Sequence, residues 1–178
     1  MLAQGYAATT VEDICEAAKL TKGSFFHYFQ TKEALGKALL QRFCSASQRT
    51  MQAACCQERD PLKRVPGLLE FMGTMAKECR GPQGCLLGTF AQELAETHPK
   101  MRAVCAEAFA LWAKRLQDDL DAAKARYAPR AKVDTASLAE YVIAVVEGAQ
   151  ILAKTQQDAT VVGKSLGHVR RYLEMVFV

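Results

Sequence analysis

The feature that most constrains this chain is a close succession of helix-start signals near its N-terminus. Thr9 with Glu12, or Thr10 with Asp13, has the spacing of a capping box, which predicts that a helix begins here. That helix must be short, because Thr21 is a second N-cap candidate soon afterwards. The sequence therefore predicts two short helices joined by a tight turn.

The remainder of the chain shows apolar residues at helical spacing, divided by Pro, Gly and Asp, with almost no strand signal. Thr31 is the cap candidate for a long third helix. After the first helix, which begins near Val11, we expect helices over about 22–29, 32–56, 61–79, 85–97, 101–127, 134–156 and 158–177. The fold class is therefore all-α, with about eight to nine helices.

The second short helix opens with small and polar residues, Thr21-Lys22-Gly23-Ser24. In a helix-turn-helix pair, the second helix lies in the major groove of DNA and brings its first turn to the base edges. Gly23 and Ser24 allow the backbone to approach closely, while Thr21 and Lys22 can reach phosphate or base acceptors. An ordinary helical hairpin in a protein core is the alternative.

Positive charge gathers around this region. Residues 19–49 hold six basic side chains and one acidic one, a net charge of +5, which leaves about −1 for the rest of the chain. Such an excess is expected of a surface that meets phosphate. A solvated helix face produces the same excess, so charge alone leaves both interpretations open.

Three runs carry a resemblance to a known family: GYAATTVEDIC from Gly5, AKLTKGSFFHYF from Ala18 and TKEAL from Thr31. Together they resemble the DNA-binding signature of the TetR family of bacterial regulators. Residues 84–94 and the pair His98-Pro99 resemble a C-terminal regulatory domain that is common in that family.

The resemblance implies an N-terminal helix-turn-helix DNA-binding domain over residues 1–43 and a C-terminal helical ligand-binding and dimerisation domain over residues 44–178. It implies base reading by residues 21–24 and contacts to the DNA backbone by the flanking positions. The implied DNA-binding set is Thr10, Thr21, Lys22, Gly23, Ser24, Phe26, His27, Tyr28 and Lys32.

Three departures from the family pattern stand out. Lys19 occupies a turn position where the family usually has Gly, which predicts an unusual backbone angle. Phe26 stands where a phosphate-contacting Tyr is usual, and without the hydroxyl it can only pack. The family's first helix precedes the Gly-Tyr pair, whereas residues 1–4 are all that precede it here, so we expect that helix to be truncated.

The resemblance also implies an effector pocket among the middle helices and a homodimer formed by the last two helices. The pocket candidates are Phe71, Met75, Leu87, Cys105, Phe109, Trp112 and Tyr141, for which simple packing is the alternative. The candidates for the dimer interface are Leu138, Val142, Val145, Ala149, Leu152, Leu166, Val169 and Leu173, for which a thicker monomer core is the alternative.

The cysteine pattern indicates neither a disulfide framework nor a zinc site, because the seven cysteines are irregularly spaced and form no C-x-x-C. We expect a reducing, cytoplasmic setting, with no metal or cofactor, no membrane span and no enzymatic motif. Cys85, at a helix start, and Cys105, near Arg102, are the best placed for a thiol switch.

The sequence as a whole predicts a ligand-responsive repressor of the TetR type, not an enzyme. Such a protein binds a palindromic operator as a homodimer and is released by a small-molecule effector. Three alternatives remain open: a repressor that senses electrophiles or oxidants through a reactive Cys, a DNA-binding protein without an effector, and a helical interaction protein that does not bind DNA.

Overall fold

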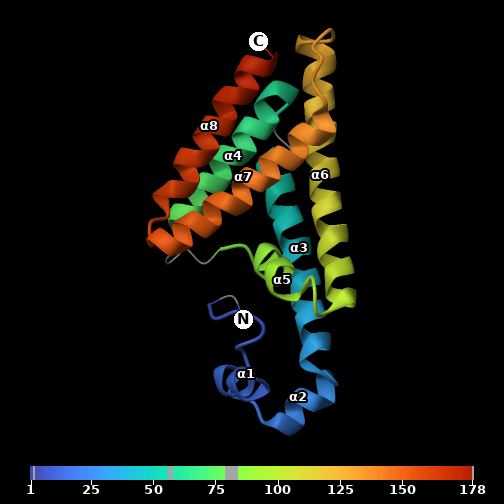
Figure 1. Ribbon diagram of the computed structural model, residues 1–178, viewed down its shortest axis with the longest axis vertical. Coiled ribbons are helices and arrows are strands. Elements are labelled where there is room, and N and C mark those ends of the chain that lie inside the picture. The colour runs from blue at the N-terminus through green and yellow to red at the C-terminus, as the bar shows by residue number, and fades with distance from the viewer. Residues whose placement is uncertain (2, 56–57, 79–83, 178) are drawn as a thin grey trace. The chain divides into compact units, whose positions relative to one another are not determined.

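The computed structural model describes residues 1, 3–55, 58–78 and 84–177. Within these residues the chain forms eight α-helices and no strand, which confirms the all-α prediction (Figure 1). The helices are α1 (Val11–Ala18), α2 (Lys22–Tyr28), α3 (Lys32–Cys55), α4 (Pro61–Glu78), α5 (Leu86–Leu94), α6 (Pro99–Tyr127), α7 (Thr135–Gln156) and α8 (Thr160–Phe177). The predicted loop over residues 81–84 lies mostly outside the described residues.

The start of α1 settles which threonine caps it. Thr10 Oγ1 accepts the N–H of Asp13 at 3.1 Å, and Asp13 Oδ2 accepts the N–H of Thr10 at 2.8 Å. The capping box is therefore the Thr10–Asp13 pair. Thr9 is instead buried and donates its hydroxyl to the carbonyl of Gly5 at 2.6 Å.

The chain divides into two compact units. The first unit comprises residues 1–47 together with 85–108, and the second comprises residues 48–84 together with 109–178. Helices α3 and α6 each contribute to both. The sequence placed the domain boundary after residue 43; that boundary stays a prediction, whereas α5 and the start of α6 fold together with the N-terminal helices.

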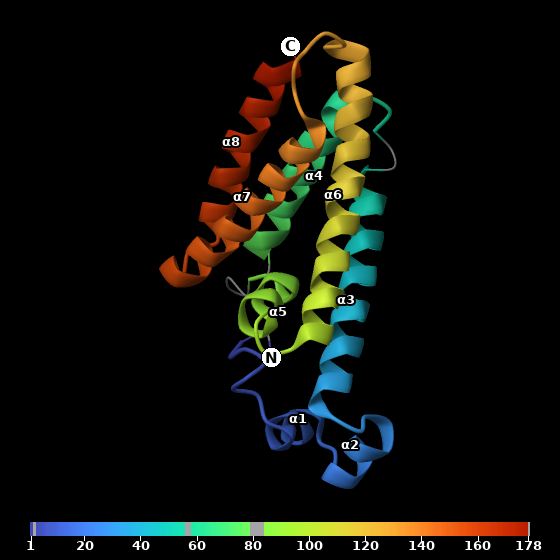
Figure 2. The ribbon, with the colours of Figure 1, turned by 45° about the vertical axis from the view of Figure 1, so that its right-hand side comes forward.

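Helix α8 packs against both α4 and α7 in the second unit (Figures 1 and 2). The apolar faces of these helices and of the second part of α6 bury a shared hydrophobic core. Its least exposed members include Val65, Leu69, Leu116, Leu120, Val142, Val146, Leu166, Val169 and Leu173. Each buried Val or Leu contributes roughly 1.5–3 kcal/mol relative to an exposed one, so this core is the main source of stability in the unit.

Helix α7 is more apolar than one buried face requires. It is long and apolar enough to cross a membrane by length and composition alone, although the sequence shows no uninterrupted apolar run of that length. The core helix of a soluble protein meets the same criterion, and 39% of the apolar window is buried in the core described above. The remainder leaves apolar side chains at the surface of the unit.

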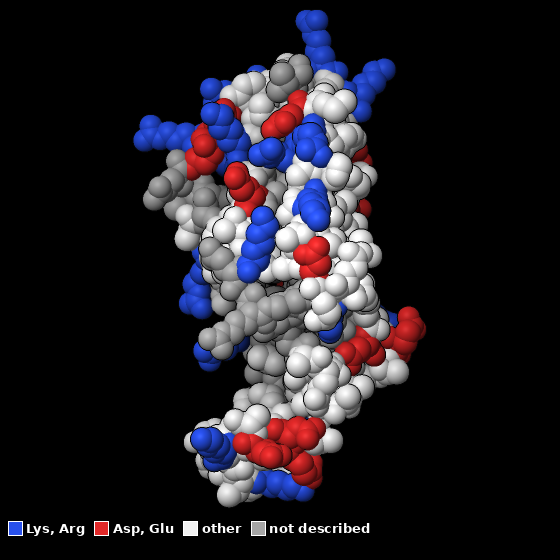
Figure 3. All heavy atoms as spheres, turned by 90° about the vertical axis from the view of Figure 1, so that its left-hand side faces the viewer, with Lys and Arg blue, Asp and Glu red and all other residues white. Residues whose placement is uncertain are grey.

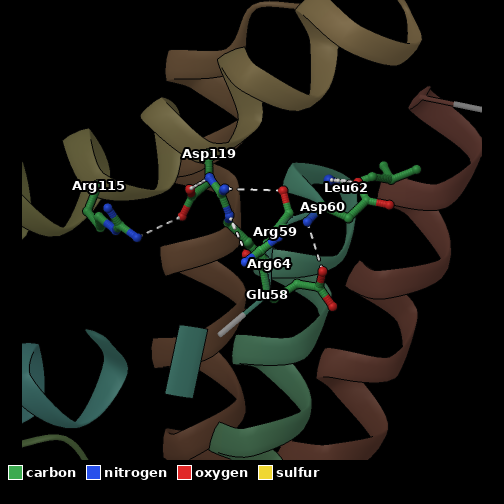
Figure 4. Close-up of polar contacts among 7 residues, drawn as sticks. All are labelled: Glu58, Arg59, Asp60, Leu62, Arg64, Arg115 and Asp119. Carbon is green, nitrogen blue, oxygen red and sulfur yellow. Dashed lines mark hydrogen bonds and ion pairs between the residues drawn. The ribbon is translucent and has the colours of Figure 1, made fainter. Parts of the chain in front are cut away.

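A buried carboxylate ties the start of α4 to α6 within the second unit. Asp119 is only 6% exposed, and its two oxygens meet Arg64 at 3.2 Å and Arg115 at 3.4 Å (Figure 4). Arg64 also donates from Nε to the carbonyl of Glu58 at 2.9 Å and from Nη2 to that of Arg59 at 3.3 Å. A buried charge is tolerated only when it is paired, so Asp119 depends on both guanidinium groups.

Two glycines allow α4 and α8 to cross closely. A Cβ on Gly73 of α4 would lie 3.2 Å from the Cα of Gly163 of α8, so backbone would have to move to make room for it. A Cβ on Gly163 would meet only the Lys77 side chain, with Cε at 3.6 Å, which is ordinary contact. The crossing therefore requires glycine at Gly73 but not at Gly163.

We expect Gly73→Ala to lower the free energy of unfolding by about 1 kcal/mol, because overpacking exceeds the gain in helix propensity. Gly163→Ala, the matched control, gains the same propensity without the clash and should raise the free energy by up to about 1 kcal/mol. Urea denaturation of both variants measures the difference. Equal stabilisation by the two alanines would contradict the close crossing.

Candidate DNA-binding site

The turn between α1 and α2 has the geometry of a helix-turn-helix. Lys19 ends α1 in the left-handed conformation, with φ 53° and ψ 42°, and its N–H bonds the carbonyls of Cys15 and Glu16. The prediction of an unusual backbone angle at Lys19 is thus confirmed. For a residue other than glycine this angle costs roughly 1–2 kcal/mol. The packing of the buried Cys15 and Phe25 side chains helps to offset that cost.

The first turn of α2 presents its polar groups to solvent. Thr21 caps the helix by accepting the N–H of Ser24 at 3.1 Å, and the two hydroxyl oxygens lie 3.0 Å apart. Thr21, Lys22 and Gly23 are exposed and Ser24 is half-buried. A Cβ on Gly23 would meet only Thr21 Oγ1, at 3.7 Å, so packing within the chain does not require this glycine. Its small size therefore remains available for an outside partner.

Lys22 is paired within the chain. Its ammonium forms an ion pair with Glu12 of α1, and both side chains remain more than half exposed. The hydrogen bond from Lys22 lowers the pKa of the Glu12 carboxyl, and Glu12 raises the pKa of Lys22. On the face shown in Figure 3, acidic and basic side chains of the α1–α2 region lie beside one another. Sequence reasoning missed Glu12, because helix spacing does not reveal contacts between helices.

The aromatic side chains of α2 divide as their helical spacing predicts. Phe25 is buried and Phe29 half-buried, which confirms the expected inner face. Phe26, His27 and Tyr28 are exposed, and Tyr28 is 75% exposed. The Phe26 ring packs edge-on against Phe25 with 5.2 Å between centroids, so Phe26 is only partly available to a partner.

Lys32, predicted to contact phosphate, is engaged by the backbone before α1. Its Nζ donates to the carbonyls of Tyr6 at 3.0 Å, Ala7 at 3.5 Å and Thr9 at 2.8 Å, and lies 4.4 Å from the centroid of the Tyr6 ring. An ammonium has three N–H donors, and these carbonyls use all of them. Binding of phosphate by Lys32 stays a prediction and requires exchange of at least one of these bonds.

The structure does not bring the predicted pocket residues together in one unit. Leu87 and Cys105 are buried in the first unit. The other candidates belong to the second unit: Phe71, Met75, Phe109, Trp112 and Tyr141. Of these, Phe109 and Trp112 stack with their centroids 6.4 Å apart, and the buried Trp112 Nε1 has no hydrogen-bond partner among the described residues.

The predicted interface residues are mostly core residues of the same chain. Leu138, Val142, Ala149, Leu166, Val169 and Leu173 are buried in the second unit and are not surface available to a partner. The most regular apolar stripe of each helix packs on neighbouring helices of its own chain, which periodicity cannot distinguish from a stripe facing a second chain. Val145 is half-buried and Leu152 is 49% exposed. Further exposed apolar side chains on α7 and α8 are Tyr141, Ile151, Tyr172 and Met175.

The cysteines best placed by sequence differ in their surroundings. Burial raises the pKa of Cys105, with a further contribution from Cys44, and burial also raises the pKa of Cys44. A raised pKa lowers the thiolate fraction and disfavours reactivity. Cys85 stands at the N-cap of α5, as predicted. Cys56 and Cys79 lie outside the described residues.

The turn at Lys19, the exposed first turn of α2 and the all-helical remainder define a helix-turn-helix regulator. The family model described as "Bacterial regulatory proteins, tetR family" matches residues 1–39, and that described as "Tetracyclin repressor-like, C-terminal domain" matches residues 61–169. The chain is 31% identical over 157 residues to the HTH-type transcriptional repressor DhaR of Mycobacterium sp. (strain GP1), covering 88% of this chain and 78% of DhaR. The chain therefore belongs to the TetR family of transcriptional regulators.

Solved structures agree with this assignment. A TetR transcriptional regulator from Chloroflexus aurantiacus superposes with a TM-score of 0.87 at 26% identity, covering 97% of this chain and 87% of that one. The TetR-family regulator CifR, as a cysteine mutant in complex with 26-base-pair operator DNA, shares the fold with a TM-score of 0.81 at 17% identity, covering 96% and 88%. TetR-family repressors thus include proteins seen bound to operator DNA.

We expect Glu12→Gln to strengthen binding to duplex DNA by about two- to fivefold, because it removes an acidic group and releases Lys22 for phosphate or base contacts. The logarithm of affinity should also fall more steeply with salt. Fluorescence anisotropy titrations at several salt concentrations measure both effects. Glu16→Gln is the matched control, since Glu16 is an exposed acid of α1 without an ion pair among the described residues. Equal gains from both variants would show that only net charge matters.

Proposed function

We propose that this chain is a repressor that binds palindromic operator DNA as a homodimer in the bacterial cytoplasm and is released by a small molecule. The observation that carries the proposal is the first turn of α2. Its polar residues are exposed, and packing within the chain does not account for Gly23. A recognition helix needs such a first turn, because there the backbone comes close enough for side chains to reach base edges.

In the proposed complex, α2 lies in the major groove. Lys22 and Ser24 supply donors suited to the acceptors of guanine and adenine, and Ser24 can also accept from an exocyclic amine. Tyr28, the most exposed aromatic of the helix, offers a hydroxyl to the DNA backbone. A two-fold dimer places two such helices in successive major grooves, about 34 Å apart, which is why the operator should be palindromic.

The exposed apolar side chains of α7 and α8 support the dimer. Tyr141 and Tyr172 pack edge-on with centroids 5.8 Å apart while each stays nearly half exposed, and Leu152 and Met175 extend the apolar surface. Exposed apolar surface on adjacent helices is typical of an interface. A two-fold interface uses the same surface on both copies. The proposed interface is therefore this surface rather than the buried stripe expected from the sequence.

The stacked pair Phe109 and Trp112 supports an effector site in the second unit. Buried polar groups are nearly always hydrogen-bonded, so the unpartnered Trp112 Nε1 is a donor suited to a ligand acceptor. Aromatic walls with a few polar groups are typical of small-molecule sites. A ligand bound there acts on DNA affinity only if it prefers one of two states of the protein, and the preference sets the size of the effect.

Selection of random duplex DNA by the purified protein at near-physiological salt tests the proposal. We expect a palindrome to be enriched, and Ser24→Ala and Lys22→Ala each to alter the preferred bases at the same positions of both half-sites, with a loss of about 1–3 kcal/mol per contact. Salt-sensitive binding without an enriched sequence would contradict specific recognition. No binding at all would favour the helical interaction protein.

We expect Leu152→Asp to convert a dimer to a monomer, because it buries an unpaired charge at the proposed interface and weakens association more than about tenfold. Leu111→Asp is the matched control, since Leu111 is an equally large side chain of α6 that is 66% exposed. Sedimentation equilibrium measures the association constants. Dimerisation of Leu152→Asp at wild-type strength would exclude this face.

A further inference from the structure

The N-terminal segment Gly5–Thr9, which precedes α1, is held by a carboxylate from α5. Glu93 Oε2 accepts the N–H of Ala7 at 2.9 Å, a contact between residues far apart in the sequence. A Cβ on Gly5 would overlap Glu93 Oε1, and Gly5 has φ +88°, so this position needs glycine for two independent reasons. All of these residues belong to the first unit.

A second set of contacts holds Tyr6 in the same segment. Tyr6 is buried, and its ring packs edge-on against Phe90 of α5 at 5.5 Å and against His98 at 5.7 Å between centroids. A Cβ on Gly36 of α3 would lie 3.0 Å from the Tyr6 ring, so α3 also contacts it closely. Lys32 of α3 bonds the segment's carbonyls, as described above. The segment is therefore fixed from two sides, by α3 and by α5.

The fixed segment leads directly into the cap of α1. Thr9 is buried, with its hydroxyl on the Gly5 carbonyl, and the next residue, Thr10, is the N-cap. Helix α1 has eight residues, too few to hold its own position or to be stable alone in water. The placement of α1, and of the turn that leads to α2, thus depends on what holds Gly5–Thr9.

We propose that Glu93 is a positioning residue for DNA binding: by holding Ala7 and enclosing Gly5, it fixes the start of α1 in the geometry that binds DNA. The inference rests on the proposed function. Glu93 touches no DNA in this proposal and acts only through the segment. If the binding-competent geometry is populated for a smaller fraction of the time, the apparent dissociation constant rises in inverse proportion to that fraction.

Two conservative variants separate the reach of the side chain from its charge. Glu93→Asp keeps the charge but is one methylene shorter, so the carboxylate no longer reaches the Ala7 N–H. Glu93→Gln loses the charge but keeps an acceptor oxygen at the same reach. We expect Glu93→Asp to weaken binding to the selected palindrome by about tenfold, the equivalent of one lost hydrogen bond to a charged group, and Glu93→Gln to stay within about threefold of wild type. Glu96→Ala, at an exposed acid two residues past the end of α5, is the control and should bind as wild type does.

Two further readouts distinguish positioning from a general loss of structure. The salt dependence of DNA binding should be unchanged in Glu93→Asp, since no phosphate contact is lost. Amide hydrogen exchange should accelerate at Ala7 and in the first turn of α1, but not in the second unit. Gly5→Ala, which disturbs the same contact from the other side, should weaken DNA binding too, and combining it with Glu93→Asp should cost less than the sum of the two effects.

Wild-type affinity in Glu93→Asp with accelerated exchange at Ala7 would overturn the proposal, because the segment would then be loosened without consequence for DNA. Wild-type affinity in Gly5→Ala would overturn it as well. Equal loss in Glu93→Asp and Glu93→Gln would also overturn it, by assigning the effect to charge. If wild type itself enriches no DNA sequence, the proposed function fails instead, and the exchange measurement alone then reports on the contact.

Discussion

The DNA-binding surface depends on helices that cannot stand alone. Helices α1 and α2 have eight and seven residues, shorter than the roughly 12–15 that make an isolated helix even marginal in water. Each buries a single side chain, Cys15 in α1 and Phe25 in α2. Their stability must come from the threonine caps and from tertiary contacts, so whatever holds the preceding segment also sets the recognition surface.

That dependence explains why the compact units do not follow the order of the sequence. Residues 85–108 fold with the N-terminal helices because the Tyr6 ring needs Phe90 and the Ala7 N–H needs Glu93. The family model for the C-terminal domain covers the same residues. A part of the chain that belongs by sequence to the regulatory domain is thus structurally part of the DNA-binding unit, where any shift of α5 acts on the start of α1.

The helices were predictable from sequence because their signals are local. Caps at Thr10 and Thr21 and the left-handed angle at Lys19 are decided within a few residues, and all were expected. Burial in three dimensions was not predictable in the same way. The stripe through Leu138 and Val142 satisfies the periodicity of a dimer interface and of a monomer core equally well, and only the positions of α4 and α8 decide for the core.

The basic residues show the same limit most clearly. Sequence places Lys22 and Lys32 where they could meet phosphate, and in the free chain both ammonium groups already have partners, Glu12 for one and three backbone carbonyls for the other. Binding DNA is then an exchange rather than a simple addition. Lys22 is exposed and leaves its partner at little cost, because surface ion pairs are worth at most about 1 kcal/mol. Lys32 is partly buried under the Tyr6 ring, and its release would undo the contacts that place α1, so of the two lysines Lys22 is the better suited to contact DNA.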